Sequence, residues 1–199
     1  FGVSTSKPGV HSLYIDEPTG SAGALWASGG GFVADQPTSF LVATANGNGA
    51  GDQPPMALNG KAASGSTNLA DSVVRYQIQG DGVRVAPSDY FGRAANDTND
   101  SDLGSSQVSA LPDQFSSPGH AHLAVVGGKF GTLYVLDRDN LGGRRVGDAG
   151  AVSALTGTQN LFGHVASWPG DGGFVYDAGD GSLNAFHLSG GSLSGVASA

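Results

Sequence analysis

Cysteine is absent from the 199 residues, and charged side chains are scarce. Without cysteine the chain has no disulfides, Cys-ligated zinc, iron–sulfur clusters or covalently attached haem. Charged residues make up only 13% of the sequence, about half the usual share. No apolar run approaches the roughly 18–20 residues that a membrane-spanning helix needs, so we expect no transmembrane segment.

Basic residues are the rarer of the two charged classes. Seventeen acidic residues against nine basic ones give a formal net charge of −8. Binding to nucleic acid needs clustered Lys and Arg to replace counterions, and the main basic cluster is Arg144-Arg145 with Arg138 nearby. A group this small is typical of a solvated turn. The charge pattern therefore predicts no nucleic-acid partner.

Helical periodicity is also nearly missing, whereas strand patterns recur along the chain. Short runs rich in Val, Leu, Tyr, Phe and Thr are bounded by Gly, Asp and Asn, and the chain has 34 glycines. The clearest predicted strands are residues 39–45, 72–78, 83–86, 121–127, 132–136, 173–178 and 182–188. Weaker candidates are 23–27, 106–111, 161–167 and 192–197. These patterns predict an all-β fold.

An internal repeat indicates how the strands are arranged. Two hairpins centred on Gly131 and Gly181 align at a spacing of 50 residues, and each consists of a strand, a tight glycine turn and a second strand. Repeats of about 40–50 residues with four short strands each are typical of β-propeller blades. The sequence therefore predicts a β-propeller of four-stranded antiparallel blades, with a sandwich or a three-sheet prism as the alternative.

About three blades fit into the chain, and three cannot close a ring. We place them at roughly 21–90, 102–150 and 158–199, with 46–70 as an inserted loop, so that residues 1–199 form a partial propeller. We expect either a longer protein, of which this chain is one part, or partner chains that complete the ring. In both cases the expected partner is a protein surface: the remaining blades or another polypeptide.

Several segments resemble one known family. The most specific is Gly127-Gly-Lys-Phe-Gly-Thr-Leu-Tyr-Val-Leu-Asp-Arg-Asp-Asn-Leu-Gly-Gly143, preceded by Asp100-Ser-Asp-Leu-Gly-Ser105. Further matches are 25–35, with Trp26 and three glycines, Ala43-Thr-Ala-Asn-Gly47, and Asp71-Ser-Val-Val-Arg75 followed by Ser88-Asp-Tyr-Phe91. Together these segments are similar to the quinoprotein-alcohol-dehydrogenase-like (PQQ-like) β-propeller superfamily, over somewhat more than half of the chain.

The resemblance implies a fold but does not choose a function, because one fold serves many functions. The superfamily includes dehydrogenases that use pyrroloquinoline quinone (PQQ) and calcium, and also secreted or periplasmic propellers that act as scaffolds. The dehydrogenases often hold the quinone against two adjacent cysteines, which this chain lacks. The sequence favours a non-catalytic scaffold or binding module that is secreted or in the cell envelope. The alternatives are a fragment of an alcohol or sugar dehydrogenase and a structural subunit of an extracellular assembly.

No catalytic or quinone-binding residue is identified, but one loop has the composition of a metal site. The stretch 96–102 is rich in carboxylates and amides, the oxygen ligands that calcium prefers. Asp97, Asp100 and Asp102 are the candidate calcium ligands. The alternative is a solvated turn, in which Asp102 caps the backbone near Gly104.

Two histidines and two tryptophans are further candidates. His120 and His122 are two residues apart on a predicted strand, so they share a face and could both reach one metal, although no third ligand is identifiable. The alternative is a pair of surface or packed histidines. Trp26 and Trp168 are expected to wedge between neighbouring sheets rather than to bind a ligand.

Overall fold

The computed structural model describes residues 2–3, 5–7, 11–12, 23–26, 28–47, 69–80, 82, 84–94 and 100–199. In these ranges the regular structure is β-strand with three short 3₁₀ turns: η2 (Leu103–Ser105), η3 (Asp113–Phe115) and η4 (Val146–Asp148). The first strands are β1 (Gly2–Val3), β2 (His11–Ser12), β3 (Val33–Gln36), β4 (Ser39–Ala43), β5 (Ser72–Ile78), β6 (Val85–Gly92) and β7 (Ser109–Ala110). They are followed by β8 (Leu123–Val126), β9 (Thr132–Asp137), β10 (Gly143–Arg144), β11 (Ser153–Thr156), β12 (Ala166–Trp168), β13 (Phe174–Ala178), β14 (Leu183–Ser189) and β15 (Ser192–Ser198). The predicted all-β class is confirmed.

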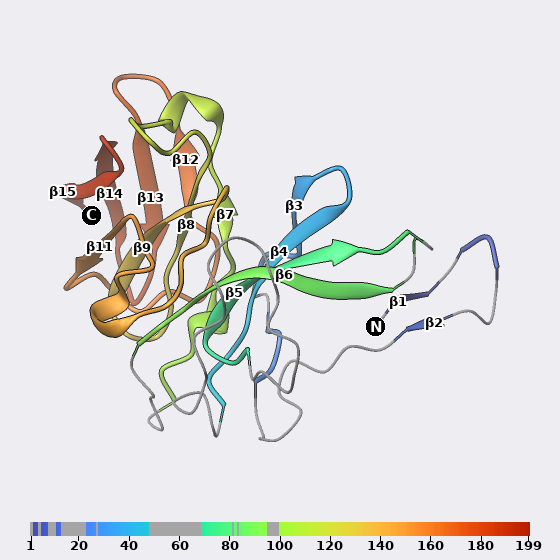
Figure 1. The fold of residues 1–199 in the computed structure, drawn as a ribbon. Coiled ribbons are helices and arrows are strands. Elements are labelled where there is room, and N and C mark those ends of the chain that lie inside the picture. Colours follow the sequence, from blue (N-terminus) through green and yellow to red (C-terminus); the bar gives the residue numbers. More distant parts are fainter. Residues whose placement is uncertain are drawn as a thin grey trace.

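Three sheets follow one another along the chain, beside a small β1–β2 hairpin (Figure 1). The first sheet has the antiparallel order β3–β4–β5–β6, extended by β10, which pairs parallel to β6. The second sheet is β7–β8–β9–β11, and the third is β12–β13–β14–β15, both antiparallel. The residues described form neither a closed ring nor a closed barrel.

The repeated hairpins lie where the sequence repeat predicts. β8–β9 forms the centre of the second sheet, and β13–β14 forms the centre of the third. The strand predicted at 72–78 agrees with β5. The strand predicted at 83–86 corresponds to β6, which begins at Val85 and continues to Gly92 past a bulge at Ser88. The weak strand predicted at 23–27 was wrong for its described residues, 23–26.

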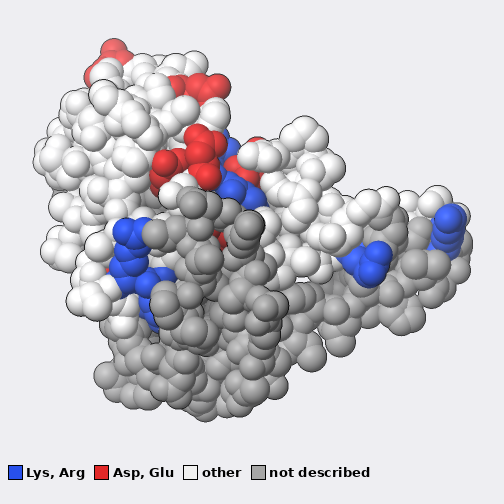
Figure 2. Space-filling view, viewed as in Figure 1, with Lys and Arg blue, Asp and Glu red and all other residues white. Residues whose placement is uncertain are grey.

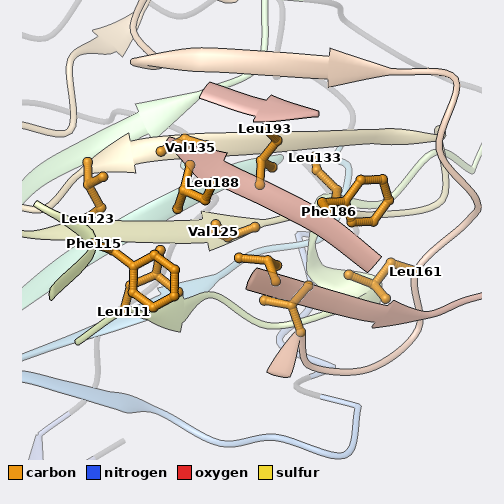
Figure 3. Packing of buried hydrophobic residues seen from close by; sticks show 12 residues of the cluster. Leu111, Phe115, Leu123, Val125, Leu133, Val135, Leu161, Phe186, Leu188 and Leu193 are labelled. Carbon is orange, nitrogen blue, oxygen red and sulfur yellow. The ribbon is translucent and has the colours of Figure 1, made fainter. Parts of the chain in front are cut away.

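Each interface between sheets contains its own hydrophobic core. Strands β8 and β9 alternate, so that one set of side chains faces the first sheet and the other faces the third. Ala124, Val126, Tyr134 and Leu136 pack against the first sheet. Leu123, Val125, Leu133 and Val135 pack against Val175, Phe186, Leu188 and Leu193 of the third, as Figure 3 shows in part. The two central strands of the second sheet are therefore buried on both faces.

Two remaining predictions concern segments of which little is described. The inserted loop expected at 46–70 lies largely outside the described residues, as does Asp97 of the predicted calcium site. Among the helical turns of the described part of the chain, none has the length and apolarity required to cross a bilayer.

Candidate functional site

The segment from Asp102 to Gln107, which contains η2 and leads into β7, joins all three sheets. Asp102 Oδ1 accepts a hydrogen bond from the Asn46 backbone nitrogen at 3.0 Å, just beyond β4 of the first sheet. Gln107 Oε1 accepts one from the Ala43 backbone nitrogen at 2.6 Å. Both side chains are buried, where an unmet polar group would be costly, so these bonds fix the first sheet against the second.

Two serines extend the same segment to the other sheets. Ser106 Oγ donates to the carbonyl oxygen of Gly127, at the end of β8. Ser105 Oγ lies 2.9 Å from the carbonyl oxygen of Leu161, which belongs to the core shared with the third sheet. The family-like Asp-Leu-Gly-Ser motif is therefore used as a structural joint.

Glycines in the family-like motifs make close backbone contacts possible at this joint. A Cβ on Gly104 would lie 2.5 Å from the Ala45 backbone nitrogen and 2.6 Å from the Thr44 carbonyl carbon. A Cβ on Gly128 would lie 2.3 Å from the Asp102 carbonyl oxygen. Real Cβ atoms do not approach backbone this closely, so a larger residue would force the sheets apart. Gly104 and Gly128 therefore act as packing residues where these segments meet.

The predicted calcium ligands Asp100 and Asp102 converge on one cation, which in this structure is the ammonium of Lys129. Lys129 Nζ lies 3.0 Å from Asp100 Oδ1 and 2.6 Å from Asp102 Oδ2, and 4.0 Å from the ring centre of Trp26. The hydrogen bond from Lys129 lowers the pKa of Asp100. Calcium could bind these two carboxylates only by displacing Lys129.

The turn proposed as the alternative to calcium also needs a correction. Asp102 precedes η2, but its side chain makes no capping hydrogen bond there. It reaches instead to Asn46 and Lys129, while its backbone oxygen accepts from the Lys129 backbone nitrogen at 3.1 Å and lies 2.9 Å from Ser105 Oγ. The local prediction was wrong because partners distant in sequence bind the carboxylate.

A second buried carboxylate, Asp71, lies between the first sheet and η2. Its Oδ2 is 2.8 Å from Arg93 Nη1, and its Oδ1 accepts from the Leu103 backbone nitrogen at 3.0 Å. The Arg93 guanidinium stacks on Phe130, 3.7 Å from the ring centre. Burial raises the pKa of Asp71 to about 6, and it outweighs the opposite effects of Arg93 and of the Leu103 hydrogen bond.

The raised pKa of Asp71 predicts how stability depends on pH. Between about pH 4 and 6 the folded state holds a proton that the unfolded state releases, so the free energy of unfolding falls as pH rises. The shift from 3.8 to about 6 corresponds to at most about 3 kcal/mol, lost as pH passes through 6. In urea unfolding from pH 4 to 7.5, we expect D71N to lack this pH dependence, because asparagine has no carboxyl group to titrate. Asparagine keeps the shape of the side chain and tolerates the φ of 52°, so the variant should fold.

Exposed Asp113 provides the matched control for that measurement. We expect D113N to change the free energy of unfolding by no more than about 0.5 kcal/mol and to follow the wild-type pH profile. An equal slope in the wild-type protein and D71N between pH 4 and 6.5 would contradict the assignment to Asp71.

An ion network spans the first and second sheets near the β3–β4 hairpin. Asp35 binds Arg75 Nε at 2.7 Å and Arg138 Nη1 at 3.2 Å. Arg75 Nη2 donates to the carbonyl oxygen of Arg138, and Arg75 Nη1 lies 3.5 Å from Asp89 Oδ2. In Figure 2, acidic and basic atoms gather side by side in this region. Arg138, predicted to lie in a solvated turn, is largely buried here.

A small pocket opens beside this network. Its volume is about 180 Å³, and it is lined by Asp35, Gln36, Pro37, His122, Arg138 and Asp139. The Asp35 carboxylate already binds two guanidinium groups, and Asp139 binds His122. The charged groups of the pocket therefore mostly satisfy one another.

His120 and His122 do not share a metal position. His120 Nδ1 lies 2.8 Å from Asp137 Oδ2, and His122 Nδ1 lies 2.9 Å from Asp139 Oδ2. No group of three or more potential metal ligands occurs among the residues that the structure describes. These two histidine–aspartate pairs could have been predicted from the hairpin, because its antiparallel register places residues 120–123 near 137–139.

The two tryptophans differ from the prediction, because neither is wedged between sheets. Trp26 is 45% exposed and stacks on Lys129. Trp168 is 55% exposed and lies directly opposite Phe174 on the face of the third sheet that points away from the second. The sequence motif around Trp26 gave no sign of the lysine partner, which lies about a hundred residues further along the chain.

No family model matches this sequence, and comparisons with curated proteins and with solved structures also find no match.

Proposed function

We propose that this chain is a non-catalytic segment of a β-propeller, secreted or in the cell envelope, that acts as a scaffold or binding module. The main support is the structural use of the family-like motif Asp100–Ser105 and of the two residues that follow it. Asp102, Gly104, Ser105, Ser106 and Gln107 hold three stacked antiparallel sheets together instead of lining an open cavity. In this proposal each four-stranded sheet is one blade, and β10 is an added edge strand.

The distribution of polar groups supports a scaffold over a dehydrogenase. The carboxylates and histidines near the pocket pair with partners within the chain, as do Asp71, Asp100 and Asp102. An acid–base group needs access to its substrate. The alternative, a fragment of a PQQ- and calcium-dependent alcohol or sugar dehydrogenase, would need a quinone site built from residues beyond these pairs.

Reconstitution separates the two proposals. The protein is incubated with PQQ and calcium, and quenching of Trp26 and Trp168 fluorescence is followed together with dye reduction by a panel of alcohols and aldoses. We expect no saturable quenching and no dye reduction, while an authentic apo-quinoprotein reconstituted in parallel is active. Saturable PQQ binding with calcium-dependent dye reduction would overturn the scaffold proposal.

A calcium titration tests the acidic loop in the same experiment. K129M removes the ammonium that holds Asp100 and Asp102, and D100N removes an exposed carboxylate. If calcium binds at this loop, K129M must bind it more tightly than the wild-type protein does, and D100N more weakly. Equal calorimetric titrations for all three proteins would place any calcium elsewhere.

A further inference from the structure

The outer face of the third sheet, which points away from the second, is apolar and uncovered. Strand alternation places on it a cluster of six side chains, together with Ala166, Ala178 and Ser194. The six are the exposed Trp168 and Leu183 and the half-buried Phe174, Tyr176, Ala185 and His187. Phe174 stacks with Tyr176 at 6.3 Å and contacts His187 at 5.5 Å between ring centres. Trp168 is 55% exposed and Leu183 54% exposed. Aromatic side chains of this size usually lie in cores or interfaces.

The internal repeat indicates that this face has the positions of a face that packs against another sheet. When the two hairpins are matched by their strand pairing, so that the pair Val125–Val135 corresponds to Tyr176–Ala185, four residues of this face correspond to residues of the second sheet that the third sheet covers. The covered residues are Leu123, Val125, Leu133 and Val135. Their counterparts on the outer face are Phe174, Tyr176, Leu183 and Ala185. The same positions are thus covered by a sheet in one repeat and open in the next.

The first sheet, at the opposite end of the stack, offers little open surface that could cover this face in another copy. The outer side of the first sheet is already buried within the chain, because Val42 and Val74 are 0% exposed and Tyr90 is 1% exposed. A head-to-tail stack of copies, with the third sheet of one against the first sheet of the next, would therefore meet a surface that is buried at its centre and open near Phe32, which is 60% exposed and stacks on Phe40.

Charge favours pairing of the outer face with itself. None of the six clustered residues is Lys, Arg, Asp or Glu, although the chain carries a net charge of −8. Two acidic chains repel each other across most surfaces, but two copies of this face meet through uncharged side chains, with Asp171, which accepts from Trp168 Nε1 at 3.4 Å, at one edge. A self-complementary contact also gives the closed twofold symmetry that most dimers have.

We propose that the outer face of the third sheet binds the same face of a second copy, giving an isologous dimer. The inference rests on the proposed scaffold role and names its partner. Strands of five to seven residues, spaced about 4.8 Å apart, give a face of about 400 Å², so the pair buries about 800 Å². This is below the roughly 1,200 Å² of a standard specific interface, so we expect a weak dimer with a dissociation constant of about 1–100 μM.

Sedimentation equilibrium of the 199-residue chain from 2 to 200 μM tests the dimer. The apparent mass should rise from 19.8 kDa towards about twice that value. L183D should raise the dissociation constant at least tenfold, because it buries a carboxylate in the apolar contact of each copy. V146D is the control, since Val146 is 95% exposed but lies between the first and second sheets in the chain, away from this face.

W168S is the second variant in case L183D does not fold, as judged by circular dichroism and the urea midpoint. A wild-type protein that stays monomeric at 200 μM overturns the dimer. A dimer that L183D and W168S leave unchanged also overturns it, and new amide protection along β15 would then indicate edge-to-edge pairing. PQQ binding and dye reduction test the scaffold proposal, whereas sedimentation tests the dimer, so the failure of one proposal can be told from the failure of the other.

Discussion

Replacing Gly104 with alanine is expected to lower the free energy of unfolding by about 3 kcal/mol. The new methyl group would lie 2.5 Å from the Ala45 backbone nitrogen and 2.6 Å from the Thr44 carbonyl carbon. These backbone atoms cannot yield easily, because hydrogen bonds from Ala43 to Gln107 and from Asn46 to Asp102 hold the same strand end. Urea unfolding followed by circular dichroism measures the loss.

The control for G104A is G163A, because a Cβ on Gly163 meets no atom within 4 Å. We expect G163A to change the free energy of unfolding by no more than about 0.5 kcal/mol. If G104A unfolds at the same urea concentration as G163A, the close contact between η2 and the first sheet does not exist in solution.

Replacing Arg75 with methionine is expected to cost about 3–5 kcal/mol, the range for breaking a buried ion pair by removing one partner. Arg75 binds Asp35 at 2.7 Å and Asp89 at 3.5 Å, and the side chains of both aspartates are less than a tenth exposed. Without the guanidinium, Asp89 remains as a buried carboxylate that keeps only its backbone donors, Tyr90 and Leu141.

The pH dependence of R75M distinguishes charge from packing. Burial raises the pKa of Asp89 even in the wild-type protein, so the uncompensated carboxylate should bind a proton as pH falls. The deficit of R75M should therefore shrink between pH 7 and 5, and adding D89N should recover part of it at pH 7. R145M is the control, because Arg145 is exposed and donates to a backbone oxygen at 3.0 Å. A pH-independent deficit would mean that Arg75 acts through packing alone.

Local patterns in the sequence predicted the strands well where they are long and apolar. The Val- and Tyr-containing run 72–78 and the glycine turns at Gly131 and Gly181 carry enough information to define β5 and both repeated hairpins. The short strands β3 and β11 escaped prediction, because they have four residues each and alternate between half-buried and exposed positions. Their place in a sheet comes from neighbouring strands, not from their own composition.

The candidate site was less predictable, because its contacts join distant segments. Spacing alone brought Asp100 and Asp102 together, but it could not reveal that Lys129 binds both. The same limit applies to Arg75, whose partners Asp35 and Asp89 come from two other strands. A charged residue in the middle of an apolar strand does signal a buried partner, because an isolated buried charge is too costly to persist.

The joint at Asp102–Gln107 has a consequence for how the molecule comes apart. In arrays of repeated units, each unit commonly contacts only its neighbours, so the units can melt one after another. Here a six-residue segment is bonded to strand ends of the first and second sheets and to the segment leading into the third. Unfolding of any one sheet therefore disrupts the contacts that hold the other two, and we expect the three sheets to unfold in a single cooperative step.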